Sequence, residues 1–180
     1  MPTLESTALW NKPWIRVLAG ALLVLAGVAT ALRLMDAAKL PQAQFTTLAG
    51  QTTNLRALAG GKPLVVNLWA TWCPPCRLEL PFLADAQFRE PGIVFVFVDQ
   101  GEDATTVTRY LRSAQLDLDN VMLDIGGGLG REIGATGLPV TLFYDANGRM
   151  ADSHLGALSP SLLADKLERL RPPARQSATR

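Results

Sequence analysis

The two cysteines of this chain, Cys73 and Cys76, stand between two segments of different character. Residues 64–69 form a short apolar run that is typical of a buried strand. Pro74 follows Cys73 and suits the first turn of a helix, which we predict over residues 74–88. A Cys-X-X-Cys pair next to a βαβ pattern indicates a redox site and constrains the domain to the α/β class.

The remaining segments extend the alternation of strands and helices. Residues 93–98 are β-branched or aromatic throughout, which predicts a strand covered on both faces. Further strands are predicted at 45–48, 121–123, 140–144 and 149–155, and helices around Val107 and Leu111, at 129–133 and at 159–170. Sequential βαβ units favour parallel pairing, whereas the Asp-Ala-Asn-Gly turn at 145–148 predicts a hairpin. We therefore expect a mixed sheet flanked by helices.

The composition excludes several classes of protein. With 17 Lys and Arg against 16 Asp and Glu, the net charge is +1, so a dedicated nucleic-acid partner is not expected. Two cysteines cannot build a disulfide-rich scaffold. One histidine and two cysteines cannot supply a four-ligand zinc site without carboxylates. No metal or other cofactor is expected besides a redox-active cysteine pair.

The N-terminal part holds an apolar stretch without a charge or an amide at residues 17–32. With its flanks it predicts a single transmembrane helix at 14–35, since a bilayer core needs about 20 apolar residues. Trp14, Arg16 and Arg33 suit the two membrane interfaces. A cleaved signal peptide and a buried helix are the alternatives, and residues 29–31 (Ala-Thr-Ala) are an acceptable cleavage signal.

We expect the chain to be organised around this segment. A cytoplasmic segment at 1–13 precedes the anchor or signal peptide at 14–35, and a linker at 36–44 follows it. The α/β domain occupies 45–171, and a flexible tail at 172–180 begins at a Pro-Pro pair that ends the last helix. Lys and Arg are balanced around the apolar stretch, so they do not orient it.

The position of Cys73 suits nucleophilic chemistry. At a helix N-terminus, unpaired N–H groups and the helix dipole favour a thiolate, the attacking species in disulfide exchange. Cys76, one turn later, is placed to attack a mixed disulfide on Cys73. Haem attachment would need a histidine where Arg77 stands. A structural bridge or a metal site remains as the alternative, although so short a loop gains little from closure.

The segment Asn-Leu-Trp-Ala-Thr-Trp-Cys-Pro-Pro-Cys-Arg-Leu-Glu-Leu-Pro resembles the active site of thioredoxin-fold oxidoreductases. More narrowly, it resembles the membrane-anchored, extracytoplasmic TlpA/ResA/CcmG group. The resemblance covers about 45–170 and includes Gly-Leu-Pro-Val-Thr at 137–141. It implies a thioredoxin-like fold in which Pro139 is the family's cis-proline. Val140 departs from the cytochrome c maturation members, which have an acidic residue after that proline.

The resemblance also implies roles for individual residues. Glu79 would take the proton of Cys76, unless it is a solvated carboxylate on the helix surface. The expected substrate-contact residues are Trp72, Pro74, Pro75, Leu138 and Pro139, where the backbone of Leu138 pairs with an extended segment. Pro81 and His154 are expected to be structural and Trp69 to lie in the core, whereas Asn67 stands where cytoplasmic thioredoxins place a buried acid. The loop at 126–130 is expected to lead into a helix near the site.

We therefore expect a membrane-tethered thiol–disulfide oxidoreductase that reduces proteins outside the cytoplasm. The expected substrates are apo-cytochromes or copper-site proteins of respiratory complexes, and a membrane electron donor would re-reduce the pair. The domain is expected to be a monomer on the periplasmic side of a bacterial inner membrane, or soluble there after signal cleavage. The alternatives in function are a disulfide oxidant or isomerase and a non-enzymatic metallochaperone or assembly factor.

Overall fold

A computed structural model of the chain describes residues 13–37 and 39–171. It divides into two compact units, 1–39 and 40–180. The first contains helix α1 (Pro13–Ala37), whose exposed apolar side chains include Leu22 and Leu23. No helix in these described ranges is long and apolar enough to cross a membrane, so the transmembrane span at 14–35 stays a prediction. The predictions for 1–12 and for the tail at 172–180 lie outside the described residues.

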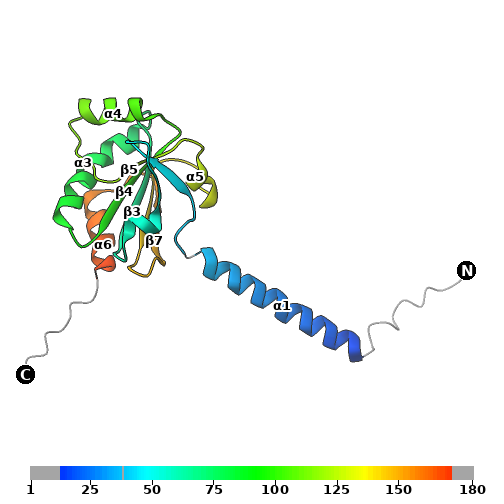
Figure 1. Cartoon of the computed structure of the whole chain (residues 1–180). Helices are drawn as coiled ribbons and strands as arrows, with labels where there is room; N and C mark the ends of the chain where they lie inside the picture. The colour runs from blue at the N-terminus through cyan, green and yellow to red at the C-terminus, as the bar shows by residue number, and fades with distance from the viewer. Residues whose placement is uncertain (1–12, 38, 172–180) are drawn as a thin grey trace, which may run out of the picture. The chain divides into compact units, whose positions relative to one another are not determined.

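The second unit is built on a seven-stranded sheet with the order β2-β1-β5-β4-β3-β6-β7 (Figure 1). Strands β3, β4 and β5 are parallel, and the other pairings are antiparallel, so the predicted mixed sheet is confirmed. The strands are β1 (Gln44–Thr47), β2 (Thr52–Asn54), β3 (Leu64–Trp69), β4 (Val94–Gln100), β5 (Val121–Asp124), β6 (Val140–Tyr144) and β7 (Met150–Leu155).

The helices of this unit cover both faces of the sheet. They are α2 (Leu55–Ala59), α3 (Pro74–Arg89), α4 (Ala104–Ser113), α5 (Gly128–Glu132) and α6 (Pro160–Leu170). Helix α2 was not expected from the sequence. Asn54 accepts a hydrogen bond from the Ala57 N–H at its start, and Gly60 ends it in the left-handed conformation at φ 54°.

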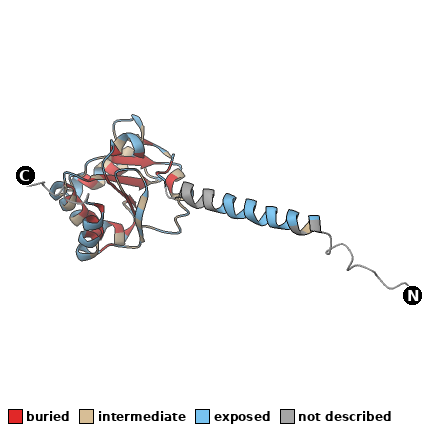
Figure 2. Ribbon diagram, turned by 90° about the horizontal axis from the view of Figure 1, so that it is seen from below, coloured by how far each residue is buried: buried red, intermediate tan, exposed pale blue. Residues whose placement is uncertain are grey.

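Alternation along β3 divides the interior into two apolar clusters. Figure 2 shows that buried residues are concentrated in the strands and on the inner sides of the helices. Val65 and Trp69 face α3, α4 and α6, which contribute Leu80, Val107 and Leu163 to the same cluster. The intervening Val66 belongs to the second cluster, with residues of α2 and α5 such as Leu55 and Leu129. Residues 95–98 of β4 are buried on both faces, as their sequence predicts.

Part of the predicted linker belongs to the second unit. Leu40 is buried, and its N–H donates to the Gly148 carbonyl at 3.0 Å. The N–H groups of Gln42 and Ala43 donate to the two carboxylate oxygens of Glu132. Gly148 has φ +74°, and a Cβ on it would lie 2.9 Å from Leu40 Cδ1, so only glycine suits this turn.

Candidate active site

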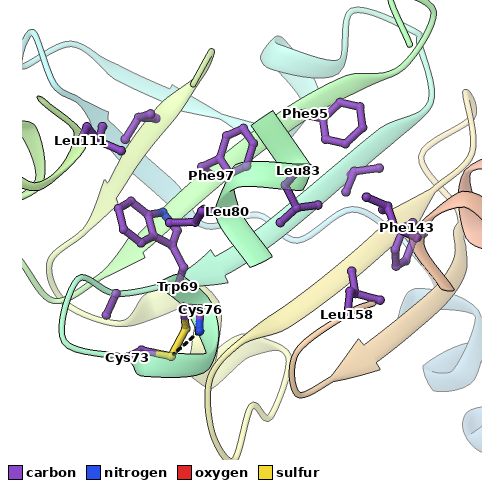
Figure 3. Packing of buried hydrophobic residues seen from close by; sticks show 14 of the residues in the cluster. Trp69, Cys73, Cys76, Leu80, Leu83, Phe95, Phe97, Leu111, Phe143 and Leu158 are labelled. Carbon is purple, nitrogen blue, oxygen red and sulfur yellow. Dashed lines mark hydrogen bonds between the residues drawn. A yellow bond between two sulfur atoms is a disulfide. The ribbon is translucent and has the colours of Figure 1, made fainter. Parts of the chain in front are cut away.

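The two cysteines lie at the N-terminus of α3, directly after the loop that leaves β3. Cys73 is the N-cap residue, and its Sγ accepts a hydrogen bond from the Cys76 N–H at 3.3 Å. The two form a disulfide, with their Cα atoms 5.3 Å apart and Pro74 in the first turn between them. Cys73 is 3% exposed, whereas Cys76 is fully buried. Figure 3 shows the disulfide at the margin of the first apolar cluster, next to Trp69.

A second loop meets the end of β3. The bond between Leu138 and Pro139 is cis, as the resemblance implies. Val140, which follows, pairs with Leu68 in the antiparallel register of β6 and β3. Pro139 therefore lies beside the end of β3, where the cysteine loop begins. Pro139 is buried and Leu138 half-buried, so Leu138 is the more accessible side chain in this loop.

Glu79 is completely buried, which excludes the solvated-surface alternative. Its carboxylate accepts hydrogen bonds from Asn67 Nδ2 at 2.7 Å and from the Leu158 N–H at 2.8 Å. Burial raises the pKa of Glu79, and the two hydrogen bonds oppose that rise without cancelling it. Three positions separate it from Cys76 in α3, so the two side chains lie on the same helix face.

The aromatic residues around the disulfide differ in exposure. Trp72 is 65% exposed, directly before Cys73, and Pro74 is exposed beside it. Trp69 is fully buried, and its ring packs against Tyr110 with a centroid separation of 5.7 Å. Trp72 is therefore open to solvent beside the cysteines, whereas Trp69 is part of the core beneath the loop.

A set of carboxyl groups beside the cysteine loop was not expected from the sequence. Thr71 donates twice to Glu102, through its N–H and its hydroxyl, both at 2.6 Å. The N–H of Glu102 in turn donates to Asp99 Oδ1 at 3.0 Å. Asp99 is completely buried, and burial together with the nearby Glu102 raises its pKa to about 8. The sequence signal for these carboxyl groups is the acidic segment that directly follows the apolar part of β4, the strand that pairs with β3 in the βαβ unit.

The glycine-rich loop at 126–130 leads into α5, as predicted. Gly127 is the N-cap in the left-handed conformation and makes no side-chain cap. Asp124 caps the helix instead, because its carboxylate accepts hydrogen bonds from the N–H groups of Gly128 at 2.7 Å and Leu129 at 2.9 Å. The loop and Leu138 line one open cleft of about 410 Å³, which places both next to the cis-proline.

The remaining predicted residues have structural environments. Pro81 lies inside α3, and Asn67 is buried and donates to Thr141 Oγ1 at 3.0 Å in addition to Glu79. His154 Nε2 lies 3.4 Å from the Ala157 carbonyl oxygen. Within the described ranges, no three His, Cys, Asp or Glu side chains are grouped as a metal site would require.

Comparison with known proteins is consistent with this geometry. The Redoxin family matches residues 35–168. The chain is 31% identical over 166 residues to the thiol:disulfide interchange protein DsbE of Pseudomonas fluorescens biotype C, covering 87% of this chain and 92% of that protein. It is 28% identical over 129 residues to the thiol-disulfide oxidoreductase ResA of Halalkalibacterium halodurans, covering 71% and 72%.

Solved structures agree in fold. The structure of MTB dsbF in its mixed oxidized and reduced forms aligns with a TM-score of 0.66 and 26% identity, covering 73% of this chain and 99% of that one. A putative thiol:disulfide interchange protein DsbE from Chlorobium tepidum aligns with a TM-score of 0.66 and 25% identity, covering 74% and 96%. With its cysteine pair at the start of α3, this chain belongs to the Redoxin family and is a thioredoxin-like thiol–disulfide oxidoreductase of the DsbE/ResA type.

Proposed function

We propose that the protein reduces disulfide bonds in other proteins, with Cys73 as the attacking residue and Cys76 as the resolving residue. The observation that carries the proposal is the position of Cys73 at the N-cap of α3, where the Cys76 N–H points at its sulfur. A sulfur that accepts this hydrogen bond at the positive end of a helix is stabilised as a thiolate. The slightly exposed Cys73 is also the more accessible of the two.

The reaction proceeds in two exchanges. The Cys73 thiolate attacks one sulfur of the substrate disulfide, a new S–S bond forms, and the other substrate sulfur leaves and takes a proton. The Cys76 thiolate then attacks Cys73, the mixed disulfide breaks, and the second substrate thiol is released. Two electrons pass to the substrate and the Cys73–Cys76 bond is formed, so the protein needs no cofactor for this step.

Glu79 is proposed to accept the proton that Cys76 loses before its attack. Its buried position raises its pKa towards that of a thiol, which makes proton exchange between the two groups easier. The hydrogen bonds from Asn67 and Leu158 fix the carboxylate in place. Glu79 therefore combines a suitable affinity for the proton with a defined position.

The substrate is proposed to lie across the two loops that meet at the end of β3. The exposed Trp72 and Pro74, with Pro75, would border it on the cysteine side. Leu138 and Pro139 would border it on the other side, with the backbone of Leu138 pairing to an extended segment. This arrangement would hold a substrate disulfide against Cys73.

We further propose that the enzyme works on the periplasmic side of a bacterial inner membrane, tethered by its N-terminal helix. The uncharged stretch at 17–32 and the resemblance of the active-site segment to membrane-anchored, extracytoplasmic oxidoreductases support this location. Substrates would be apo-cytochromes or copper-site proteins, and a membrane thiol donor would re-reduce the enzyme. Recovery of the intact chain in the membrane fraction is expected, whereas a mature N-terminus at Leu32 would mean that the stretch is a cleaved signal.

The direction of electron flow is tested by the reduction potential of the Cys73–Cys76 couple. We expect a value more negative than about −200 mV when the full chain is equilibrated with glutathione buffers, because a reductant must give electrons to substrate disulfides. A value near about −120 mV, which is typical of a strong oxidant, would contradict the reducing role.

A further inference from the structure

The loop between β3 and the active-site disulfide is held by a carboxyl group from another part of the chain. Thr71, two residues before Cys73, donates both its N–H and its hydroxyl to Glu102, each at 2.6 Å. Such short hydrogen bonds to a carboxylate are among the stronger ones in proteins. Two donors from one residue fix its orientation as well as its position, so Glu102 acts as a clamp on the loop.

The clamp is itself anchored in the sheet. The Glu102 N–H donates to Oδ1 of Asp99, which lies in β4 and is completely buried. Asp99 pairs with Trp69 in the parallel register of β4 and β3, so it stands beside the residue from which the cysteine loop departs. The chain of contacts from Asp99 through Glu102 to Thr71 therefore connects the rigid sheet to the loop that carries Trp72 and Cys73.

The second carboxyl oxygen of Asp99 is buried and accepts no hydrogen bond. An ionised carboxylate in that environment, close to the carboxylate of Glu102, would be costly. A protonated Asp99 avoids that cost and offers its O–H to Glu102. The raised pKa of Asp99, about 8, agrees with this state at neutral pH.

We propose that Glu102, anchored by Asp99, is a positioning residue for thiol–disulfide exchange: it fixes Thr71 and thereby sets the placement of Trp72 and Cys73 against the substrate. The proposal rests on the proposed attacking role of Cys73. Glu102 does not touch the sulfurs, so its effect is exerted through Thr71.

Thr71→Val tests the clamp, because it removes the hydroxyl donor while keeping the shape of the side chain. The rate at which the reduced enzyme attacks a substrate disulfide should fall by roughly 10-fold, since small misplacements of a reacting group are costly. Thr71→Ser, which retains the hydroxyl, should restore most of that loss. Glu102→Gln should also slow the attack, because its amide can accept only part of the two hydrogen bonds.

Asp145→Asn is the matched control. Asp145 also accepts two backbone N–H groups, from Asn147 and Arg149, but it lies at the end of β6 away from the cis-proline. It should lower stability without lowering the attack rate of the folded protein. If Thr71→Val and Glu102→Gln attack the substrate disulfide at the wild-type rate, or at the same rate as Asp145→Asn, the clamp has no positioning role.

Titration of the oxidised protein gives an independent readout, because disulfide-bonded cysteines do not titrate. The charged groups that interact with Asp99 are Glu102 and Asp103 in the following loop. On the helices packed nearby, Arg109 of α4 interacts with Asp103, and Arg77 of α3 lies over the Tyr110 ring, which packs against Trp69. Tryptophan fluorescence should change near pH 8 as Asp99 ionises beside Trp69. Asp99→Asn should abolish the change, and Glu79→Gln should leave it in place.

A fluorescence change that survives in Asp99→Asn, or is absent from the wild type, would overturn the anchoring role of Asp99. Cys73→Ser separates this proposal from the proposed function. If Cys73→Ser still reduces substrate, the proposed function fails. If Cys73→Ser is inactive while Thr71→Val and Glu102→Gln are unaffected, only the clamp fails.

Discussion

At the level of a single residue, Glu79 provides the most specific test of the proposed proton transfer from Cys76. Glu79→Gln removes the proton acceptor, so resolution of the mixed disulfide should slow by roughly 10- to 100-fold. The amide of glutamine cannot accept from both Asn67 and Leu158, so stability should also fall by about 1–3 kcal/mol. The lifetime of a mixed disulfide in stopped-flow experiments checks the rate, and its pH dependence should shift with it.

Glu90→Gln is a suitable control for this experiment, since Glu90 caps the far end of the same helix and binds Arg171 at the surface. It should leave resolution unchanged. Equal rates in the wild type and Glu79→Gln would show that water or another group takes the proton, and the cysteine pair would keep its role.

The sequence predicted the cysteine pair at the start of α3 and the cis bond at Pro139, because each belongs to a short local motif. It left open whether Glu79 is buried, since burial depends on Leu158, far along the chain. The two hydrogen bonds from Thr71 to Glu102 could not be predicted for the same reason. Such contacts join segments that no local pattern relates.

At the level of elements, α5 depends on a cap from outside the helix. Asp124 accepts two N–H groups of α5 and the Gln100 side-chain amide at 3.2 Å. Asp124→Ala should therefore cost roughly 2–4 kcal/mol of unfolding free energy, measured by urea denaturation. Ser159→Ala, which removes an ordinary N-cap from α6, should cost about 1 kcal/mol. Equal losses in the two variants would argue against the additional role of Asp124.

Element boundaries followed the apolar periodicity where elements were long. Helices α3 and α6 and strand β4 were predicted to within a residue or two. Helix α2 has only five residues, which is too short for a helical period to be recognised. The contact of Leu40 with Gly148 could likewise not be predicted from the sequence, because a linker and a packed extended segment have similar compositions.

For the whole molecule, two buried carboxyl groups determine how stability depends on pH. The pKa of Glu79 is raised, and that of Asp99 is raised to about 8, so both bind protons more tightly in the folded state. Their contribution to the unfolding free energy is present at low pH and is lost as the pH rises through the raised pKa values. The exposed Asp103 and the half-buried Asp145 and Asp152 have lowered pKa values. Their contribution to the unfolding free energy is lost only as the solution becomes acidic.

The unfolding free energy of the oxidised protein should therefore decrease by at least about 1 kcal/mol between pH 5 and pH 8. Asp99→Asn removes one of the two responsible groups and should make that decrease smaller. Urea denaturation at several pH values checks both statements. A flat or rising profile in the wild type, or an unchanged slope in Asp99→Asn, would contradict this account of the buried carboxyls.

The division of labour between the cysteines is tested most directly by trapping. Cys76→Ser leaves Cys73 without its resolving partner, so incubation with a disulfide substrate should accumulate a mixed disulfide that mass spectrometry maps to Cys73. Cys73→Ser should form no such adduct and should not reduce the substrate. Adducts on Cys76 in Cys73→Ser at the rate seen on Cys73 in Cys76→Ser, or substrate reduction that survives without Cys73, would contradict the account.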